Sequence, residues 1–183
     1  SLVGSEMCIR DRSRLVSDLL DISAMEEGKF KLNMVEFDIN ILIKQCIANF
    51  DGKIRNKGVN VEVTFGREHE FVYADRDRLI QVLTNIIDNA IKYSNDDGCI
   101  KITTNDKGSK VYVSVFNNGP LLKSEELARI WDRFYKSDKA RINKESTGLG
   151  LPIVRLILAQ HGEDIWVNNE KDGVRFTFTI SKI

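Results

Sequence analysis

The stretch that decides the fold is residues 74–94, ADRDRLIQVLTNIIDNAIKYS. Asp75 stands where a helix N-cap acceptor would, and no Gly or Pro interrupts the run before Ser94, so we predict one helix of about five turns. Its apolar residues recur at spacings of three and four and predict a buried stripe. They are Leu79, Val82, Leu83, Ile86, Ala90 and Ile91.

A polar row occupies another face of this helix. Asn85, Asp88, Asn89 and Lys92 follow at i, i+3, i+4 and i+7, which brings them into line. Polar residues on an exposed helix face are often only solvated surface. A nucleoside triphosphate, however, brings its own negative charge, so a neutral Asn oxygen suits Mg²⁺ and a Lys suits the phosphates. Asn89 and Lys92 therefore form a candidate nucleotide site.

Composition excludes several other classes of protein. The 183 residues are 42% hydrophobic, enough for one packed domain. Lys plus Arg and Asp plus Glu each number 27, so no net charge draws the chain to nucleic acid or to an anionic membrane. Three cysteines without metal-ligand spacing argue against disulfides and zinc. No apolar run approaches the ~20 residues that span a bilayer, so we expect this chain not to be membrane-inserted.

Periodicity and turn residues predict the remaining elements. Helices are expected at residues 13–27, 38–57 and 149–160, and strands at 30–37, 59–65, 71–73, 98–104, 110–116, 165–167 and 176–180. Residues 1–12, SLVGSEMCIRDR, fit none of these elements. They closely resemble a translated sequencing-adapter peptide, so we set them apart as an artefactual or disordered N-terminus.

Three more segments carry chemistry. VFNNGP at 115–120 ends a strand in a turn, IWDRFYK at 130–136 is aromatic and basic, and STGLGL at 146–151 opens a helix. Glycines before a helix N-terminus let backbone N–H groups approach an anion. A single GxG is weak, but its position after an Asn-rich helix and a strand-ending NxG turn is far more specific.

This ordered set resembles the catalytic and ATP-binding domain of bacterial sensor histidine kinases, a member of the superfamily with the Bergerat (GHKL) nucleotide fold. Residues 84–94 resemble its N box, 117–120 its first glycine box, 131–136 its F box and 147–151 its second glycine box. The implied fold is α+β, a two-layer sandwich whose mixed, mainly antiparallel sheet carries helices on one face.

The resemblance also implies the domain boundaries. Residues 13–28 are similar to the end of the second helix of the dimerisation and phosphotransfer hairpin, which makes a helical segment ahead of the catalytic domain. Residues 29–183 correspond to that domain, with an ATP lid at about 121–146.

The resemblance assigns roles to individual residues. Asn89 would ligate Mg²⁺, while Asn85 and Lys92 would contact the phosphates of ATP. Tyr93, Asn117 and Gly119 would lie at the adenine, and Lys136 would reach the γ-phosphate, which makes Lys92 and Lys136 the catalytic candidates. The triphosphate would rest on the second glycine box, that is, on Thr147, Gly148, Leu149, Gly150 and Leu151.

Three positions depart from the family pattern. Asn117 replaces an Asp that accepts from the adenine amino group, and an amide oxygen can accept the same bond. Leu121 replaces a glycine and should stiffen the first hinge of the lid. Val174 or Arg175 replaces a Thr in the last strand. None of these changes removes a metal or phosphate contact.

The phosphoacceptor histidine is expected upstream of Ser13, because His69 and His161 lie in the wrong context. By resemblance, the whole protein would be a homodimer in the bacterial cell membrane with this domain in the cytoplasm, and it would phosphorylate a response regulator. Two rivals stay open: a regulatory module that binds nucleotide without transferring phosphate, and an ATPase of the same superfamily. The ATPase is disfavoured because Asn85 stands where its catalytic Glu would be.

Overall fold

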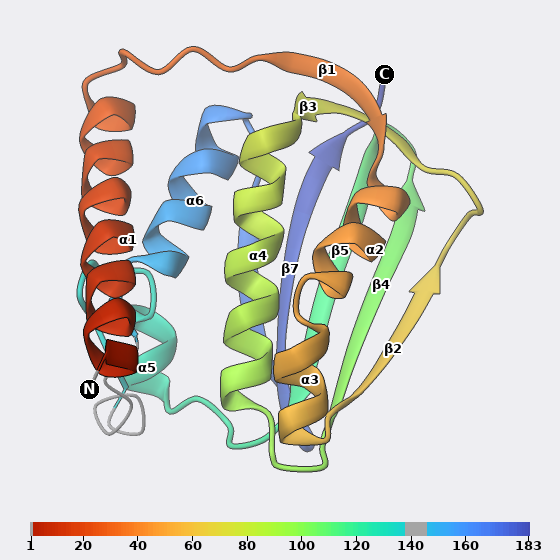
Figure 1. Ribbon diagram of the computed structural model, residues 1–183. Helices are drawn as coiled ribbons and strands as arrows, with labels where there is room; N and C mark the ends of the chain where they lie inside the picture. The colour runs from red at the N-terminus through yellow and green to blue at the C-terminus, as the bar shows by residue number, and fades with distance from the viewer. Residues whose placement is uncertain (1, 138–145) are drawn as a thin grey trace.

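The structure is a computed structural model that describes residues 2–137 and 146–183. Helices and strands are interspersed along the chain, singly or in consecutive pairs (Figure 1). The helices are α1 (Leu2–Glu26), α2 (Ile39–Ala48), α3 (Asp51–Lys57), α4 (Arg76–Tyr93), α5 (Ser124–Arg129) and α6 (Gly150–Gln160). The strands are β1 (Met34–Asp38), β2 (Asn60–Phe65), β3 (Phe71–Asp75), β4 (Cys99–Lys107), β5 (Lys110–Asn118), β6 (Ile165–Glu170) and β7 (Gly173–Ser181).

The main sheet has five strands in the order β2-β4-β5-β7-β6. Strands β2 and β4 run parallel, whereas β4–β5, β5–β7 and β6–β7 are antiparallel. Strands β1 and β3 form a separate antiparallel pair. The prediction of a mixed, mainly antiparallel sheet is therefore confirmed.

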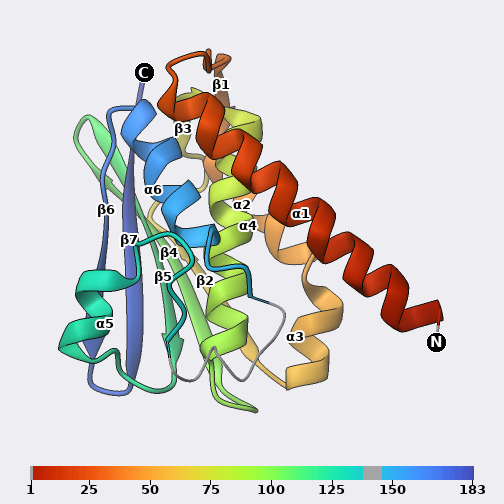
Figure 2. The ribbon, with the colours of Figure 1, turned by 90° about the vertical axis from the view of Figure 1, so that its left-hand side faces the viewer.

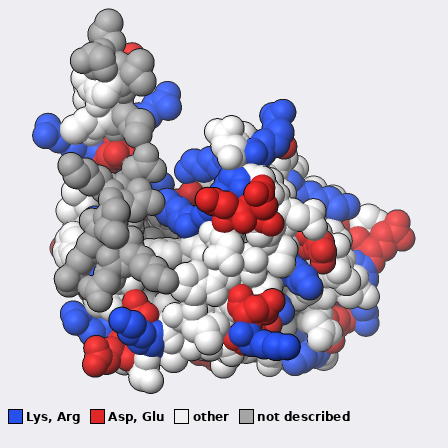
Figure 3. Space-filling model, turned by 90° about the horizontal axis from the view of Figure 1, so that it is seen from below, with Lys and Arg blue, Asp and Glu red and all other residues white. Residues whose placement is uncertain are grey.

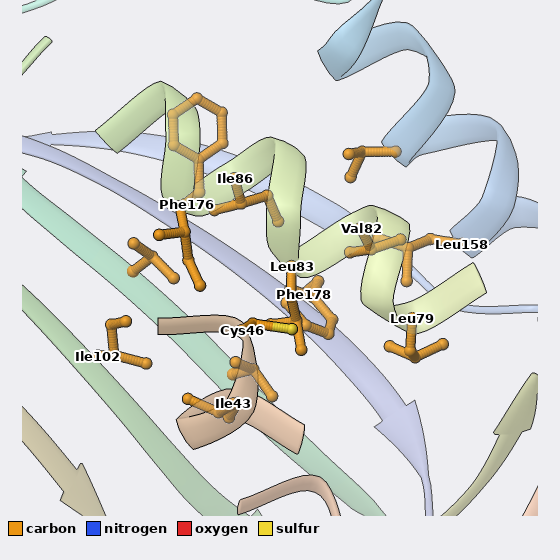
Figure 4. Packing of buried hydrophobic residues seen from close by; sticks show 14 of the residues in the cluster. Ile43, Cys46, Leu79, Val82, Leu83, Ile86, Ile102, Leu158, Phe176 and Phe178 are labelled. Atoms are coloured by element: carbon orange, nitrogen blue, oxygen red, sulfur yellow. The ribbon is translucent and has the colours of Figure 1, made fainter. Parts of the chain in front are cut away.

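Helices α2, α3, α4 and α6 lie against one face of the main sheet, and α1 lies outside α4 and α6 (Figures 1 and 2). The core fills the space between this helical layer and the sheet (Figure 4). Leu83 of α4 and Phe178 of β7 are both fully buried there. Burying one such side chain stabilises a fold by about 1.5–3 kcal/mol, so the central helix is held mainly by its apolar stripe.

The central helix α4 forms as its sequence predicts. The Asp75 side chain accepts a hydrogen bond from the Arg78 N–H and caps the first turn. At the other end, the Lys57 ammonium donates to the carbonyls of Ile91 at 2.6 Å and Lys92 at 2.8 Å. The predicted stripe is buried along its whole length.

Several predicted boundaries differ from the structure, and three of the differences are the most informative. The first helix begins at Leu2 rather than at residue 13, because no Pro interrupts residues 2–12 and Gly4 is accommodated within the helix. Strand β1 begins at Met34 rather than Phe30, since its partner β3 is only five residues long. The helix expected at 38–57 is two helices, because the chain turns at Phe50 and buries that ring.

The surface shows no single dominant charge on the face seen from below, where basic and acidic side chains are interspersed (Figure 3). Within the described part of the chain, no helix combines the length and the apolarity needed to cross a bilayer.

Candidate functional site

Two adjoining cavities lie beside the C-terminal half of α4. The larger, of about 510 Å³, falls in the range of small-molecule pockets. The smaller reaches the start of α6. Six residues border both cavities, so the two form one continuous site. These are Asn89, Lys92, Ile130, Tyr135, Ser146 and Leu151.

A buried carboxylate fixes the ammonium of the polar row. Asp88 is 5% exposed, and its two oxygens lie 3.0 Å from the Lys92 ammonium and 3.0 Å from that of Lys53 on α3. Burial alone would raise the pKa of the Asp88 carboxyl, but the two lysines outweigh burial and hold that pKa below its ordinary value. Lys92 is thus a positioned, charged group at the wall of both cavities.

Asn89 lies at the junction of the cavities. It is half-buried, and among the described residues its side-chain amide has no hydrogen-bond partner. No group of three or more His, Cys, Asp or Glu residues in the described ranges could hold a metal ion. The neutral amide oxygen of Asn89 suits a hard cation that keeps water or phosphate oxygens as its other ligands, which is how Mg²⁺ binds.

The glycine-rich loop closes the smaller cavity. Gly148 has φ +73°, and its carbonyl accepts a hydrogen bond from the Phe134 N–H at 3.0 Å. A Cβ at Gly150 would lie 3.4 Å from Asn85 Oδ1, so only glycine leaves this gap free. The first turn of α6 begins here, and its N–H groups have no carbonyl partner within the helix. This combination forms an anion cradle.

The larger cavity extends to the C-terminal end of α4. Tyr93, Asn117, Val174 and Phe176 border it. The Nδ2 group of Asn117 donates to the Asn118 carbonyl at 3.1 Å, which leaves Oδ1 as a free acceptor. Burial raises the pKa of the Tyr93 hydroxyl, against a hydrogen bond with Ser137 that lowers it. Among its polar and apolar lining residues, this end places the free Asn117 acceptor beside apolar and aromatic side chains, an arrangement that suits a purine base.

Most predicted site residues meet at these cavities. Among the described residues, the cavity linings include Asn85, Asn89, Lys92, Tyr93, Asn117, Thr147, Gly148, Gly150 and Leu151.

Three predicted residues do not border either cavity. Leu149 is fully buried in the core. Gly119 packs against the backbone of Tyr93, because a Cβ added at Gly119 would lie 2.4 Å from the Tyr93 carbonyl oxygen. Lys136 follows a turn at Phe134, which has φ +61°, and the neighbouring Tyr135 borders both cavities. Part of the expected lid, 138–145, lies outside the described residues.

The aromatic residues of the F-box segment, 131–136, have different positions: one packs on the sheet, one is exposed and one borders the cavities. Trp131 packs edge-to-face on Phe176 at 6.0 Å and beneath the Arg155 guanidinium at 5.6 Å, so it anchors this segment to the sheet. Phe134 is exposed, whereas Tyr135 borders both cavities.

Sequence reasoning missed two groups at the site. The salt bridge of Asp88 with Lys92 could have been read from its i, i+4 spacing. Arg14 of α1 lines the smaller cavity and donates to Asn85 Oδ1 at 3.1 Å. Nothing in the local sequence around Arg14 signals a contact with a residue so far along the chain.

Comparisons with known proteins give a consistent result. Residues 74–182 match the family model described as histidine kinase-, DNA gyrase B-, and HSP90-like ATPase. The sensor histidine kinase WalK of Bacillus subtilis is 34% identical over 171 residues, covering 91% of this chain and 28% of WalK. The chain therefore spans little more than a quarter of that relative.

Solved structures also match. Histidine kinase ThkA in complex with response regulator protein TrrA is 36% identical, with a TM-score of 0.78 over 96% of this chain and 49% of that one. Full-length ShkA in complex with AMPPNP is 27% identical, with a TM-score of 0.83 over 94% of this chain and 37% of that one. The likeness includes α1 as well as the sandwich, because 96% coverage leaves little of the chain outside it.

Proposed function

Because this chain belongs to the family of histidine kinase-, DNA gyrase B- and HSP90-like ATPases, we propose that it is the ATP-binding kinase domain of a sensor histidine kinase. It would bind Mg²⁺ and ATP and transfer the γ-phosphoryl group to a histidine outside this chain. The observation that carries the proposal is the position of the Asn89 amide, without a hydrogen-bond partner among the described residues, between a cavity suited to adenine and a glycine-rich anion cradle.

Each group would have one task. Asn117 Oδ1 accepts from the adenine amino group, and Tyr93 packs beside the base. Lys92, held by Asp88, and the backbone N–H groups at Gly148 and Gly150 bind phosphate oxygens. Asn89 would hold Mg²⁺, which would supply positive charge to neutralise the phosphates.

Phosphoryl transfer asks a protein mainly for positioning and charge neutralisation. The bond between the γ-phosphorus and the bridging oxygen breaks as a bond to a histidine nitrogen forms, and ADP leaves with the bonding electrons. Here Lys92 and the cradle hold the phosphates in line. The role predicted for Lys136 stays a prediction, since among the described residues it borders neither cavity.

The whole protein would act in two-component signalling. We infer that it dimerises through the complete hairpin, that it is anchored in the bacterial cell membrane with this domain in the cytoplasm, and that it passes phosphate to a response regulator receiver domain. The relative ThkA was solved with such a regulator, which supports this inference.

Replacing Asn89 with Ala tests the metal ligand. Loss of outer-shell partners already weakens metal binding 10- to 100-fold, so Asn89→Ala should weaken Mg²⁺–ATP by about 100-fold or more. Calorimetry measures the affinity, and an unchanged circular dichroism spectrum shows that the fold is intact. Asn168→Ala, an exposed asparagine on β6, is the matched control and should bind like wild type. Unchanged affinity of Asn89→Ala would refute the site.

The kinase and its regulatory rival differ in chemistry. Radiolabelled ATP is supplied with a separate hairpin that carries the phosphoacceptor histidine, and label on the hairpin is measured. Transfer supports the kinase. Tight nucleotide binding with no transfer would favour a regulatory module, to which Asn117 and Leu121 already point as departures from the family pattern.

A further inference from the structure

Arg14 of α1 enters the phosphate end of the site. It lines the smaller cavity together with Asn85, Asn89, Gly148 and Gly150. Its Nη2 lies 3.1 Å from Asn85 Oδ1, although α1 and α4 are far apart in the sequence. No other residue of α1 lines this cavity or the larger one among the described residues.

This contact determines how Asn85 faces the cavity. The guanidinium occupies the Oδ1 acceptor of Asn85, so the Nδ2 group is left to donate. A guanidinium carries five N–H donors in a fixed fork. One is used on Asn85. The others make no hydrogen bond with the described residues, although the Asp18 carboxylate lies near enough to interact with the charge. Arg14 and Asn85 together thus offer donors to a phosphate at the wall opposite Gly150.

The C-terminal half of α1 holds Arg14 in place. Ile22 and Met25 are buried against the domain. Asp21 accepts from Arg78 Nη1 at 3.3 Å and from Gln81 Nε2 at 3.4 Å, both on α4. Figure 2 shows α1 crossing over α4 and α6 as a straight helix. Docking of this helix and the presence of Arg14 at the cavity are therefore one structural event.

The two ends of the site locate the phosphate that Arg14 meets. Asn117 lies only in the larger cavity, whereas Arg14 lies only in the smaller one. A nucleotide whose base contacts Asn117 extends its phosphates toward the smaller cavity, and the last phosphate comes nearest to Arg14.

We propose that Arg14 is a specificity-determining residue that recognises the terminal phosphate of ATP and thereby couples the docked position of α1 to the nucleotide state of the domain. This inference rests on the proposed function. Guanidinium binds phosphate in a bidentate manner, so the contact favours a triphosphate over a diphosphate. Binding linkage is reciprocal: a γ-phosphate that prefers docked α1 also stabilises that docking, and ADP lacks this stabilisation.

The test compares affinities for the ATP analogue AMPPNP and for ADP, each with Mg²⁺, by calorimetry. Arg14→Gln removes the charge, and Arg14→Lys keeps it without the fork. Arg12→Gln is the matched control, because Arg12 is an exposed arginine on the same helix that lines a groove away from the site. Thermal unfolding confirms that all variants fold.

Arg14→Gln should weaken AMPPNP at least about fivefold more than ADP, the lower end of typical coupling between sites. The loss of AMPPNP affinity relative to ADP should be intermediate in Arg14→Lys. Arg12→Gln should bind both nucleotides like wild type. Amide exchange in α1 should be slower with AMPPNP than with ADP in wild type, and this difference should vanish in Arg14→Gln.

Equal losses for both nucleotides, or tighter AMPPNP binding by Arg14→Gln, would overturn the inference; the second result would mean that Arg14 competes with phosphate. If wild type binds AMPPNP and ADP but no variant alters their ratio, only this inference fails. If wild type binds neither, the proposed function fails and the inference with it.

Discussion

Replacing Asp88 with Asn should destabilise the domain by removing a buried charge that two lysines need. The Asp88 side chain is 7% exposed, and its partners Lys92 and Lys53 are 23% and 59% exposed, each at 3.0 Å. Breaking a fully buried pair costs about 3–5 kcal/mol and an exposed pair contributes about 0–1 kcal/mol. Lys92 is partly sheltered from solvent and Lys53 is exposed. We therefore expect the loss of stability in Asp88→Asn to lie between these limits, at about 2 kcal/mol.

Chemical denaturation at neutral pH measures this loss, and thermal unfolding should show a decrease in Tm of roughly 4–8 °C. Asp51→Asn is the matched control. Asp51 pairs with Arg55 at 2.6 Å, but the two side chains are 64% and 75% exposed. Its removal should cost no more than about 0.5 kcal/mol.

The pH dependence gives a second check. The pKa of Asp88 is lowered in the folded protein by its lysine partners, against the effect of burial. Its stabilisation is therefore complete above the pKa of an unfolded aspartate, near pH 4, and is lost as the pH falls through the lowered folded pKa. The difference in the free energy of unfolding between wild type and Asp88→Asn should be constant from about pH 6 to 8 and should disappear in acid. A gap no larger than that of Asp51→Asn, or one that widens in acid, would refute this reasoning.

Two further substitutions test the adenine end. Asn117→Asp keeps an acceptor for the base but loses the donor to the Asn118 carbonyl. ATP affinity should therefore stay the same or increase, while the free energy of unfolding falls by about 1 kcal/mol. A large loss of affinity would show that the base needs the amide NH₂. Gly119→Ala should destabilise by about 1–3 kcal/mol, because φ is +143° and the new Cβ would meet the Tyr93 carbonyl oxygen at 2.4 Å. Gly52→Ala, where nothing lies within 4 Å, is its control and should be neutral or stabilising in denaturant titrations.

Local signals in the sequence predict most of the fold. The α4 stripe, its Asp75 cap and the hairpin of β4 and β5 each depend on neighbouring residues, so periodicity and turn chemistry are enough to find them. The start of β1 depends instead on the length of β3, and the break at Phe50 depends on a core pocket that only the folded chain provides.

The candidate site also contains residues that local sequence patterns predict and residues that only tertiary packing brings in. Asn85, Asn89 and Lys92 share one helix, so spacing alone places them together. Lys53, Arg14 and the turn at Phe134 reach the site through tertiary packing, and no pattern near them signals it. Lys136 follows the turn at Phe134, whose N–H donates to the Gly148 carbonyl, and its predicted contact with the γ-phosphate stays a prediction.

The parallel pairing of β2 with β4 has a consequence for the order in which the domain assembles. Parallel neighbours need a long crossover, and here that crossover is the segment 66–98, which contains β3 and the whole of α4. β2 pairs within the main sheet only with β4, at the edge. We therefore expect the edge strand to close after the helix that carries Asn89 has packed, so that the β2–β4 hydrogen bonds are among the last to form.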